Sequence, residues 1–219
     1  MGDGKAMPEH VDSAVPEARE TGRLEAFSDG VFAIAITRLV LELKVPDVAV
    51  AGTSPKALAA ALLHQWPSYV GLVTSFSTVL IMWVHHHAIL RSVCRTDAWL
   101  HFANGWLLLC VTFVPYPTSI LAAYLRTNAA KMAAAFYSGT FVLIAVSFYL
   151  FIRAAFRKPL LSSDASQEFV AKTRRDYMFG PPMYLMATVS AFLNDRLSLA
   201  ICTLLWILWA TTITKNTRA

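Results

Sequence analysis

Long apolar runs, interrupted by short polar segments, dominate the hydrophobic pattern of the chain. A helix needs about 20 residues to cross a bilayer, and most of these runs are that long. The pattern therefore predicts an all-α membrane protein with six transmembrane helices per chain. The predicted spans are 24–44, 61–90, 99–124, 132–156, 178–194 and 197–214, and together they form one transmembrane domain over residues 23–215.

Proline and turn residues modify the later spans. The second span is over-long and contains Pro67, which predicts a kink or a tilted helix. The fifth span is short and is expected to begin at Gly180-Pro181-Pro182, because proline is tolerated in the first turn of a helix. Asn194-Asp195 predicts a tight turn between the last two spans.

The two ends of the chain are polar. Residues 1–22 contain five acidic residues and two prolines, and they are expected to form a disordered cytoplasmic tail. Residues 216–219 are expected to form a short cytoplasmic C-terminus. No apolar segment precedes the first span, so no cleaved signal peptide is expected.

Composition and charge agree with a membrane protein. Hydrophobic residues make up 56% of the chain and charged residues only 15%, whereas soluble domains carry about 25% charged residues. Much of the net charge of +5 lies in connecting segments, so it does not indicate nucleic-acid binding. With the N-terminus inside, the inner segments hold 13 Lys and Arg residues and the outer segments 5. This asymmetry predicts that both termini are cytoplasmic and that the basic segment 157–176 sets the topology.

One face of the first span is distinctive. At 100° per residue, Phe27, Ile34, Arg38 and Leu41 fall within about 60° of one another. Gly30 and Thr37 flank this stripe. The alternative interpretation is a helix that packs on all sides, with Ile34 and Leu41 in an ordinary core.

Polar residues gather at the beginning of the first span. Ser28 and Asp29 point away from the stripe, which predicts contact with neighbouring helices. Buried polar groups need hydrogen-bonding partners, so we expect one network to connect the first three spans at their cytoplasmic ends. Its candidate members are Arg23, Ser28, Asp29, His86, His87, Asp97 and Asn104.

Metal binding and catalysis are not expected. The three consecutive histidines His85, His86 and His87 point about 100° apart on a helix, so they cannot all face one ion. Asp29 with His86 or His87 could form an acid/base pair, but no nucleophile motif, glycine-rich phosphate loop or catalytic carboxylate pair accompanies it. The three cysteines do not suggest a disulfide framework. We therefore predict neither an enzyme nor a cofactor.

The motifs resemble a known family at this point. Arg23-x-x-x-Phe27-Ser28-Asp29-Gly30-Val-Phe-Ala-Ile34-Ala-Ile-Thr37 is similar to the signature of the transmembrane protein 175 potassium channels of lysosomes and bacteria. The likeness continues in Leu41-Glu42-Leu43-Lys44-Val45-Pro46 and Trp83-x-x-His86-His87. It returns in Asp97-x-x-Leu100-x-x-x-Asn104 and in Pro115-Tyr116-Pro117-Thr118, so it covers most of residues 23–120.

The resemblance implies an architecture and a set of roles. It implies a homotetramer in the bacterial plasma membrane, without the usual filter loop, in which the first helices line a central pore for potassium. Ile34 would form a narrow hydrophobic constriction, Leu41 a further apolar layer, and Thr37 a layer linked to potassium selectivity. A network at the cytoplasmic end would hold the pore helix, and it would comprise Arg23, Phe27, Ser28, Asp29, His86, His87 and Asn104.

Arg38 departs from the family pattern, which normally has an apolar residue there. Four guanidinium groups around a narrow pore would repel cations strongly. Arg38 could weaken conduction, extend towards the outer vestibule, or pair with Glu42 on a rotated helix. We favour an orientation outside the constriction in the closed state.

The sequence thus predicts a cation channel that is either potassium-selective or potassium-permeable, and it leaves open whether other monovalent cations or protons also pass. The alternative is a proton-coupled or proton-leak transporter that uses Asp29 and the nearby histidines. The first span has no interior proline and its carboxylate lies near one end, which disfavours alternating access. A non-conducting membrane protein is a third interpretation, suggested mainly by Arg38.

Overall fold

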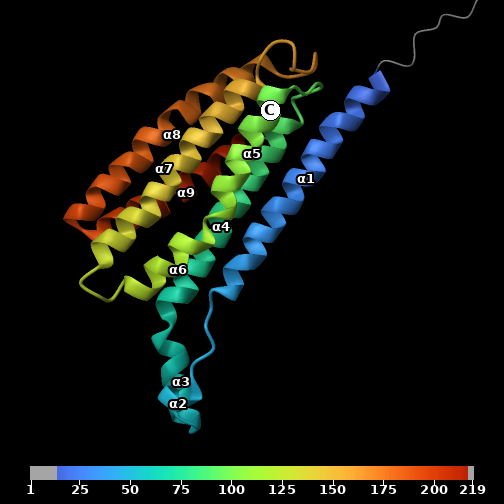
Figure 1. The fold of residues 1–219 in the computed structure, drawn as a ribbon. Helices are drawn as coiled ribbons and strands as arrows, with labels where there is room; N and C mark the ends of the chain where they lie inside the picture. Colours follow the sequence, from blue (N-terminus) through green and yellow to red (C-terminus); the bar gives the residue numbers. More distant parts are fainter. Residues whose placement is uncertain (1–13, 217–219) are drawn as a thin grey trace, which may run out of the picture.

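The computed structural model describes residues 14–216, and all its regular elements are helices (Figure 1). The helices are α1 (Ala14–Leu41), α2 (Val48–Ala51), α3 (Pro55–His64), α4 (Trp66–Leu90), α5 (Ala98–Thr112), α6 (Pro115–Tyr124), α7 (Ala130–Ala155), α8 (Gln167–Leu193) and α9 (Asp195–Asn216).

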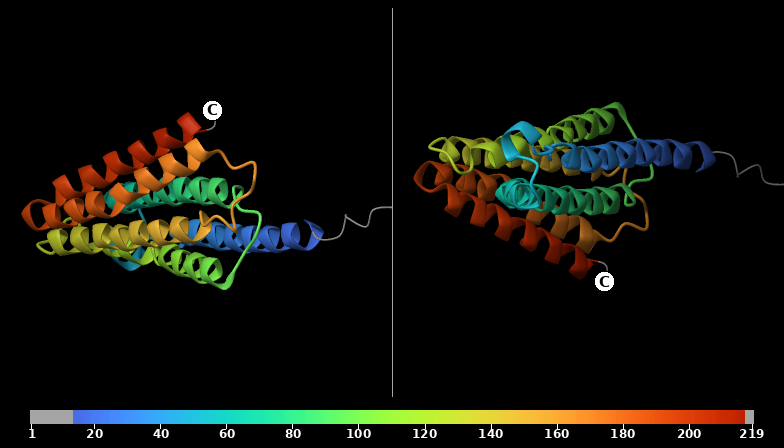
Figure 2. Two further views of the ribbon diagram at one scale, coloured as in Figure 1. Left: turned by 90° about the horizontal axis from the view of Figure 1, so that it is seen from above. Right: turned by 90° about the horizontal axis from the view of Figure 1, so that it is seen from below.

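The long helices run side by side, and α1 lies at one edge of the bundle (Figures 1 and 2). It packs against α4 and α5, while α7, α8 and α9 pack together on the other side. The start of α1, the α4–α5 and α7–α8 loops and the end of α9 all lie at one end of the bundle, here called the terminus end. Helices α2 and α3 project from the opposite end, the far end.

Three helical segments are long and apolar enough to cross a membrane. They are Trp66–Leu90, Ala98–Tyr124 and Ala130–Ala155. The chain is therefore an integral membrane protein, as the hydrophobic pattern predicts. Helices α1, α8 and α9 contain 28, 27 and 22 residues, so they match the other three in length.

Prolines break two of the predicted spans into separate helices. Residues 61–64 belong to α3, and α4 begins at Trp66, because Pro67 cannot donate an amide hydrogen bond and its ring clashes with the preceding turn. The helix is thus interrupted at the single residue Gln65, just before Pro67, where a kink or tilt is expected. The predicted span 99–124 is likewise divided into α5 and α6, at the residues just before Pro115.

Two other helices begin earlier than the sequence predicts. Helix α8 begins at Gln167, where Ser166 accepts a hydrogen bond from the amide of Phe169 (3.3 Å), so Pro181 and Pro182 lie inside the helix. Packing against α7 and α9 sustains a helix across these prolines, as neighbouring helices do in membranes. Helix α1 begins at Ala14, so the part of the predicted disordered tail from 14 to 22 is helical, and residues 1–13 lie outside the described region.

The loops at the terminus end are tied together. The amide of Cys94 donates to the carbonyl of Leu160 (2.9 Å), and the amide of Ser162 donates to the carbonyl of Ser92 (3.0 Å). Arg157 also forms an ion pair with Asp97. These contacts join the α4–α5 loop to the α7–α8 loop.

Candidate ion pathway and its anchoring network

Helix α1 has one packed face and one open face. The packed face contains Leu24, Ser28, Phe32, Ala35 and Leu39, which are all buried. Their spacing of three or four residues places them along one side of the helix, against α4 and α5.

The open face carries the stripe that the sequence singles out. Phe27 is 62% exposed, Ile34 59% and Leu41 76%. Thr37 and Arg38 are exposed on the same face. A row of large apolar side chains along a helix, without partners in its own chain, marks a surface that another molecule or a lipid covers.

The Thr37 hydroxyl is oriented by its own helix. Thr37 Oγ1 donates a hydrogen bond to the carbonyl oxygen of Ile34 (3.0 Å). Because the hydroxyl proton is used in this bond, the oxygen's lone pairs face away from the helix. In this orientation the oxygen presents a partial negative charge to a cation beside the helix.

Arg38 forms no ion pair with Glu42 within the described part of the chain. The interpretation of a rotated helix that pairs the two residues is therefore wrong for this structure. The guanidinium extends from the open face, about one helical turn beyond Ile34.

A buried hydrogen-bonded chain links α1, α4 and α5 (residues Ser28, His86 and Asn104). The amide group of Asn104 donates to Ser28 Oγ (3.0 Å), and Ser28 Oγ donates to the carbonyl of Leu24 (2.8 Å). Asn104 Oδ1 lies 2.7 Å from His86 Nε2 and must accept from it, since a carbonyl oxygen has no proton. The proton of a neutral His86 therefore lies on Nε2.

Aromatic rings hold His86 in this orientation. Its ring stacks on Phe151 of α7, with centroids 4.8 Å apart, and contacts Phe32 of α1 at 5.2 Å. Only 1% of His86 is exposed. The hydrogen-bonded chain is thus enclosed by apolar side chains, where an unpaired polar group would be costly.

A second polar group lies beside the first, between α1 and α4. The indole nitrogen of Trp83 donates to Asp29 Oδ1 (2.8 Å). His87 Nδ1 lies 2.7 Å from Glu25 Oε1, and both side chains are about one third exposed. Ser28, Asp29, His86, His87 and Asn104 therefore all lie at the terminus end, but in two groups instead of one network.

Three of the candidate residues lie outside both groups. Asp97 caps α5 by accepting from the amide of Leu100 (2.8 Å) and pairs with Arg157. Arg23 is exposed, and Phe27 lies on the open face, with no hydrogen bond or ion pair among the described side chains of this chain.

Glu25 is not among the residues singled out from the sequence, and Trp83 is given there only within the motif Trp83-x-x-His86-His87, without a role in the polar groups. A signal for each role was available, because both residues lie one helical turn before a recognised polar residue, Asp29 and His87 respectively. Side chains four residues apart are neighbours on a helix.

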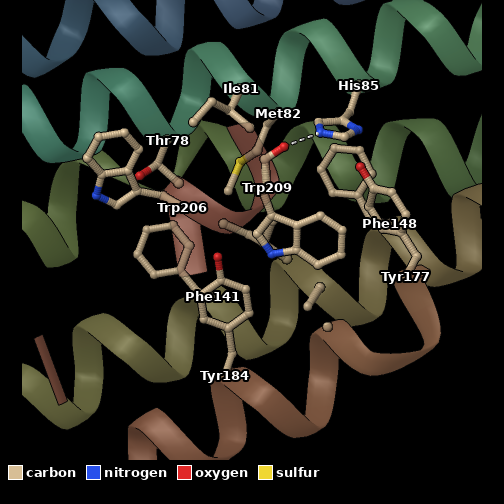
Figure 3. A pocket seen from close by; sticks show the side chains of 13 residues that line it. Thr78, Ile81, Met82, His85, Phe141, Phe148, Tyr177, Tyr184, Trp206 and Trp209 are labelled. Carbon is tan, nitrogen blue, oxygen red and sulfur yellow. Dashed lines mark hydrogen bonds between the residues drawn. The ribbon is translucent and has the colours of Figure 1, made fainter. Parts of the chain in front are cut away.

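A small aromatic cavity lies away from α1, between α4, α7, α8 and α9 (Figure 3). Tyr177, Tyr184 and Trp209 line it, and the ring of His85 lies 3.1 Å from the carbonyl oxygen of Trp209. Its volume of about 40 Å³ is large enough to hold buried water.

The comparisons with known proteins bear on this geometry. The profile of the family described as "Endosomal/lysosomal potassium channel TMEM175" matches residues 23–115. A potassium channel of Chamaesiphon minutus is 47% identical over 196 residues, covering 89% of this chain and 96% of the relative. The chain belongs to the TMEM175 family. This family consists of ion channels and not of enzymes.

Two further relatives extend the TMEM175 comparison. A potassium channel of Streptomyces collinus is 42% identical, covering 83% of this chain and 87% of the relative. The endosomal/lysosomal proton channel TMEM175 of Homo sapiens is 31% identical, covering 58% of this chain and 26% of the relative.

A solved structure supports the TMEM175 fold. The crystal structure of a lysosomal potassium-selective channel TMEM175 homologue from Chamaesiphon minutus superposes with a TM-score of 0.81 at 45% identity. The superposition covers 89% of this chain and 98% of that one. The helix arrangement described above is therefore the TMEM175 arrangement.

Proposed function

We propose that the chain is a potassium-permeable cation channel in which four copies surround a central pore lined by their α1 helices. The open face of α1 carries this proposal. Its apolar side chains are largely exposed among residues 14–216, and the stripe is the one that the family resemblance assigns to the pore. A ring of four such faces would shield these side chains from lipid and give potassium a path.

The pore would be closed by its own apolar side chains. Ile34 of each copy would form a hydrophobic constriction that excludes water in the closed state. Thr37, one turn further, would offer hydroxyl oxygens in place of part of the potassium hydration shell. Leu41 would form a second apolar layer towards the far end.

Six membrane spans per chain agree with the positions of the termini. Both described ends of the chain lie at the terminus end, as an even number of crossings requires (Figure 1). The distribution of basic residues supports placing this end in the cytoplasm of a bacterial cell. The two polar groups would then brace α1 at its cytoplasmic end.

Substitution of Arg38 tests the pathway. Potassium flux into proteoliposomes should be about tenfold or more higher for Arg38→Leu than for the unmodified protein. One unit charge about 6 Å from the ion raises its energy by about 3 kcal/mol at an effective dielectric constant of about 20, and about 1.4 kcal/mol corresponds to a factor of ten in rate.

Two controls accompany this measurement. Arg38→Lys keeps the charge and should conduct like the unmodified protein. Arg196→Leu removes an exposed arginine at the start of α9 and should change nothing. Equal flux from Arg38→Leu and from the unmodified protein would mean that Arg38 is outside the ion path. No flux from either would contradict the channel itself.

Shortening Ile34 tests the constriction. Ile34→Ala should raise potassium flux, because a wider and less apolar ring admits water. Val189→Ala is a matched control, since Val189 is 58% exposed on α8 and Ile34 is 59% exposed on α1. If both variants conduct like the unmodified protein, Ile34 does not form the gate.

A second candidate function is proton conduction, because vertebrate relatives are named proton channels. Asp29 is next to Ser28 in the sequence, and Ser28 belongs to the buried hydrogen-bonded chain. Asp29→Asn should lower proton flux and spare potassium flux if protons pass this way. Parallel changes in both fluxes would assign Asp29 a bracing role alone.

A further inference from the structure

Glu25, Asp29 and His87, which belong to the second polar group, also form a cluster of possible metal ligands. One potential ligand atom from each residue lies within 4.8 Å of the other two. The carboxylates come from successive turns of α1 and the imidazole comes from α4. The run of three histidines therefore does not form a site, but one of its members meets two acidic residues of another helix.

The set of ligand atoms matches a particular class of ion. Two carboxylate oxygens and one imidazole nitrogen are ligands typical of zinc, at about 2.0–2.2 Å from the metal. Magnesium and calcium prefer oxygen ligands only. Three protein ligands leave a fourth position for water, as in zinc sites that remain open to solvent.

Trp83 lies beside two of the possible ligands, Asp29 and His87, and leaves both available to an ion. Trp83 donates to Asp29 Oδ1, which fixes the carboxylate and leaves its other oxygen available. The rings of Trp83 and His87 lie 5.8 Å apart on the same side of α4. Because about one third of both Glu25 and His87 is exposed, an ion can enter from solvent.

We propose that Glu25, Asp29 and His87 bind Zn²⁺ and that the bound ion clamps α1 to α4 at the terminus end. The ion replaces the contact between His87 and Glu25 with metal–ligand bonds from both helices. A ligand that binds only the folded arrangement stabilises it. Zinc therefore holds the proposed pore helix in its present position against α4, a property separate from ion conduction.

Zinc binding to the purified full chain, without a histidine tag, tests the site. The background carries His10→Ala and Cys94→Ser, which remove other zinc ligands. We expect one Zn²⁺ per chain by titration calorimetry and a higher midpoint of thermal unfolding with Zn²⁺. Mg²⁺ and Ca²⁺ should produce neither effect.

Three variants of the cluster and one control give the test its specificity. Glu25→Gln and His87→Ala should each weaken zinc binding by about tenfold or more and abolish the thermal shift, since metal sites lose affinity steeply when a ligand group is disturbed. Glu25→His should retain binding, because imidazole replaces carboxylate as a ligand. His101→Ala is the matched control, because His101 is exposed near the same end on α5 and is outside the cluster.

Zinc binding and thermal unfolding are measured without any ion flux. A failure of the zinc site can therefore be told apart from a failure of the proposed channel function. Unchanged zinc binding in Glu25→Gln and His87→Ala would overturn the site. Equal loss in His101→Ala would assign the binding to exposed histidines in general and would also overturn it. Loss in Glu25→Gln with rescue in Glu25→His would support direct coordination.

Discussion

At the scale of the residue, the three consecutive histidines of α4 show that neighbouring side chains on one helix have different environments. His85 contacts the carbonyl of Trp209, His86 contacts Asn104, and His87 contacts Glu25. Each step turns the side chain by about 100°. One residue type therefore occupies the aromatic core, a buried hydrogen-bonded chain and a partly exposed contact with a carboxylate.

Asn104 is the residue on which the buried chain depends. Asn104→Ala leaves His86 and Ser28 without their shared partner in an apolar enclosure, at a cost of about 1–3 kcal/mol. For a chain of this size, each kcal/mol lowers the unfolding midpoint by about 2–4 °C. Thermal unfolding in detergent should therefore show a fall of several degrees.

The control for this loss is Asn128→Ala, which removes an exposed asparagine from the α6–α7 connection. It should leave the midpoint unchanged. Ser28→Ala should lower the midpoint by less than Asn104→Ala does, because the Ser28 hydroxyl donates its hydrogen bond to the Leu24 carbonyl of the same helix. A midpoint for Asn104→Ala equal to that of Asn128→Ala would refute the importance of the buried chain.

The sequence predicts single polar residues better than it predicts their pairing. Ser28 and Asp29 lie opposite the apolar stripe by angle alone, and the structure places both against neighbouring helices. Which partner each one selects depends on the depth and rotation of α4 and α5. Those quantities are set by packing, so the sequence could not separate the two polar groups, although the spacing of four residues between Glu25 and Asp29 was a signal for Glu25.

At the scale of the element, the contact between α4 and α6 depends on a glycine. A Cβ atom added at Gly71 would lie 3.3 Å from Thr118 Cγ2. Thr118 has little freedom to move, because its hydroxyl donates to the carbonyl of Val114 (2.8 Å) and lies 2.8 Å from Ser75 Oγ. Close approach of membrane helices commonly needs such small residues.

Substitution of Gly71 tests this contact. In a helix interior, alanine is favoured over glycine by about 1 kcal/mol. Gly71→Ala should nevertheless lower the unfolding midpoint, because the close contact of the added Cβ with Thr118 outweighs the favourable helix propensity of alanine. Gly139→Ala should be neutral or stabilising, because its Cβ would meet Thr188 Cγ2 at an ordinary 3.8 Å. Equal midpoints for the two variants would show that α4 and α6 adjust freely.

The hydrophobic pattern predicts which segments are helical better than it predicts where each helix begins and ends. Apolar runs predict that helices exist at α4, α5 and α7, because hydropathy reports burial in lipid or protein. They do not report whether a proline breaks a helix. Pro67 and Pro115 lie at breaks, whereas Pro181 and Pro182 lie inside α8. The difference comes from the helices that pack around each proline.

At the scale of the whole molecule, the terminus end joins the two sides of the bundle. The Asp97 carboxylate accepts from the amide of Leu100 at the start of α5 and pairs with Arg157 after α7. These two contacts lower the pKa of Asp97, the hydrogen bond from Leu100 having the larger effect. Because the pKa of Asp97 is lowered in the folded protein, its ionised carboxylate stabilises the fold at any pH above the ordinary pKa of an aspartate. This stabilisation is lost as the pH falls through the lowered pKa.

Asp97→Asn tests this linkage. The amide can still accept from Leu100 but carries no charge for Arg157. The variant should be less stable than the unmodified protein near pH 7, and the difference should shrink as pH falls to about 3. Unfolding midpoints across this range measure it, with Asp164→Asn in the exposed α7–α8 loop as the control. A difference that stays constant with pH would contradict the linkage.

The two halves of α1 are held by different kinds of force. Near the terminus end, directional bonds at Ser28 and Asp29 fix the helix, whereas Ala35 and Leu39 are held by apolar packing. The helix thus resembles a lever pivoting near Ser28, with Ile34 about 9 Å and Arg38 about 15 Å from the pivot along the axis. In the proposed tetramer, any tilt would displace the four Arg38 side chains by more than the four Ile34 side chains, so a given opening angle would relieve charge repulsion faster than it would widen the apolar constriction.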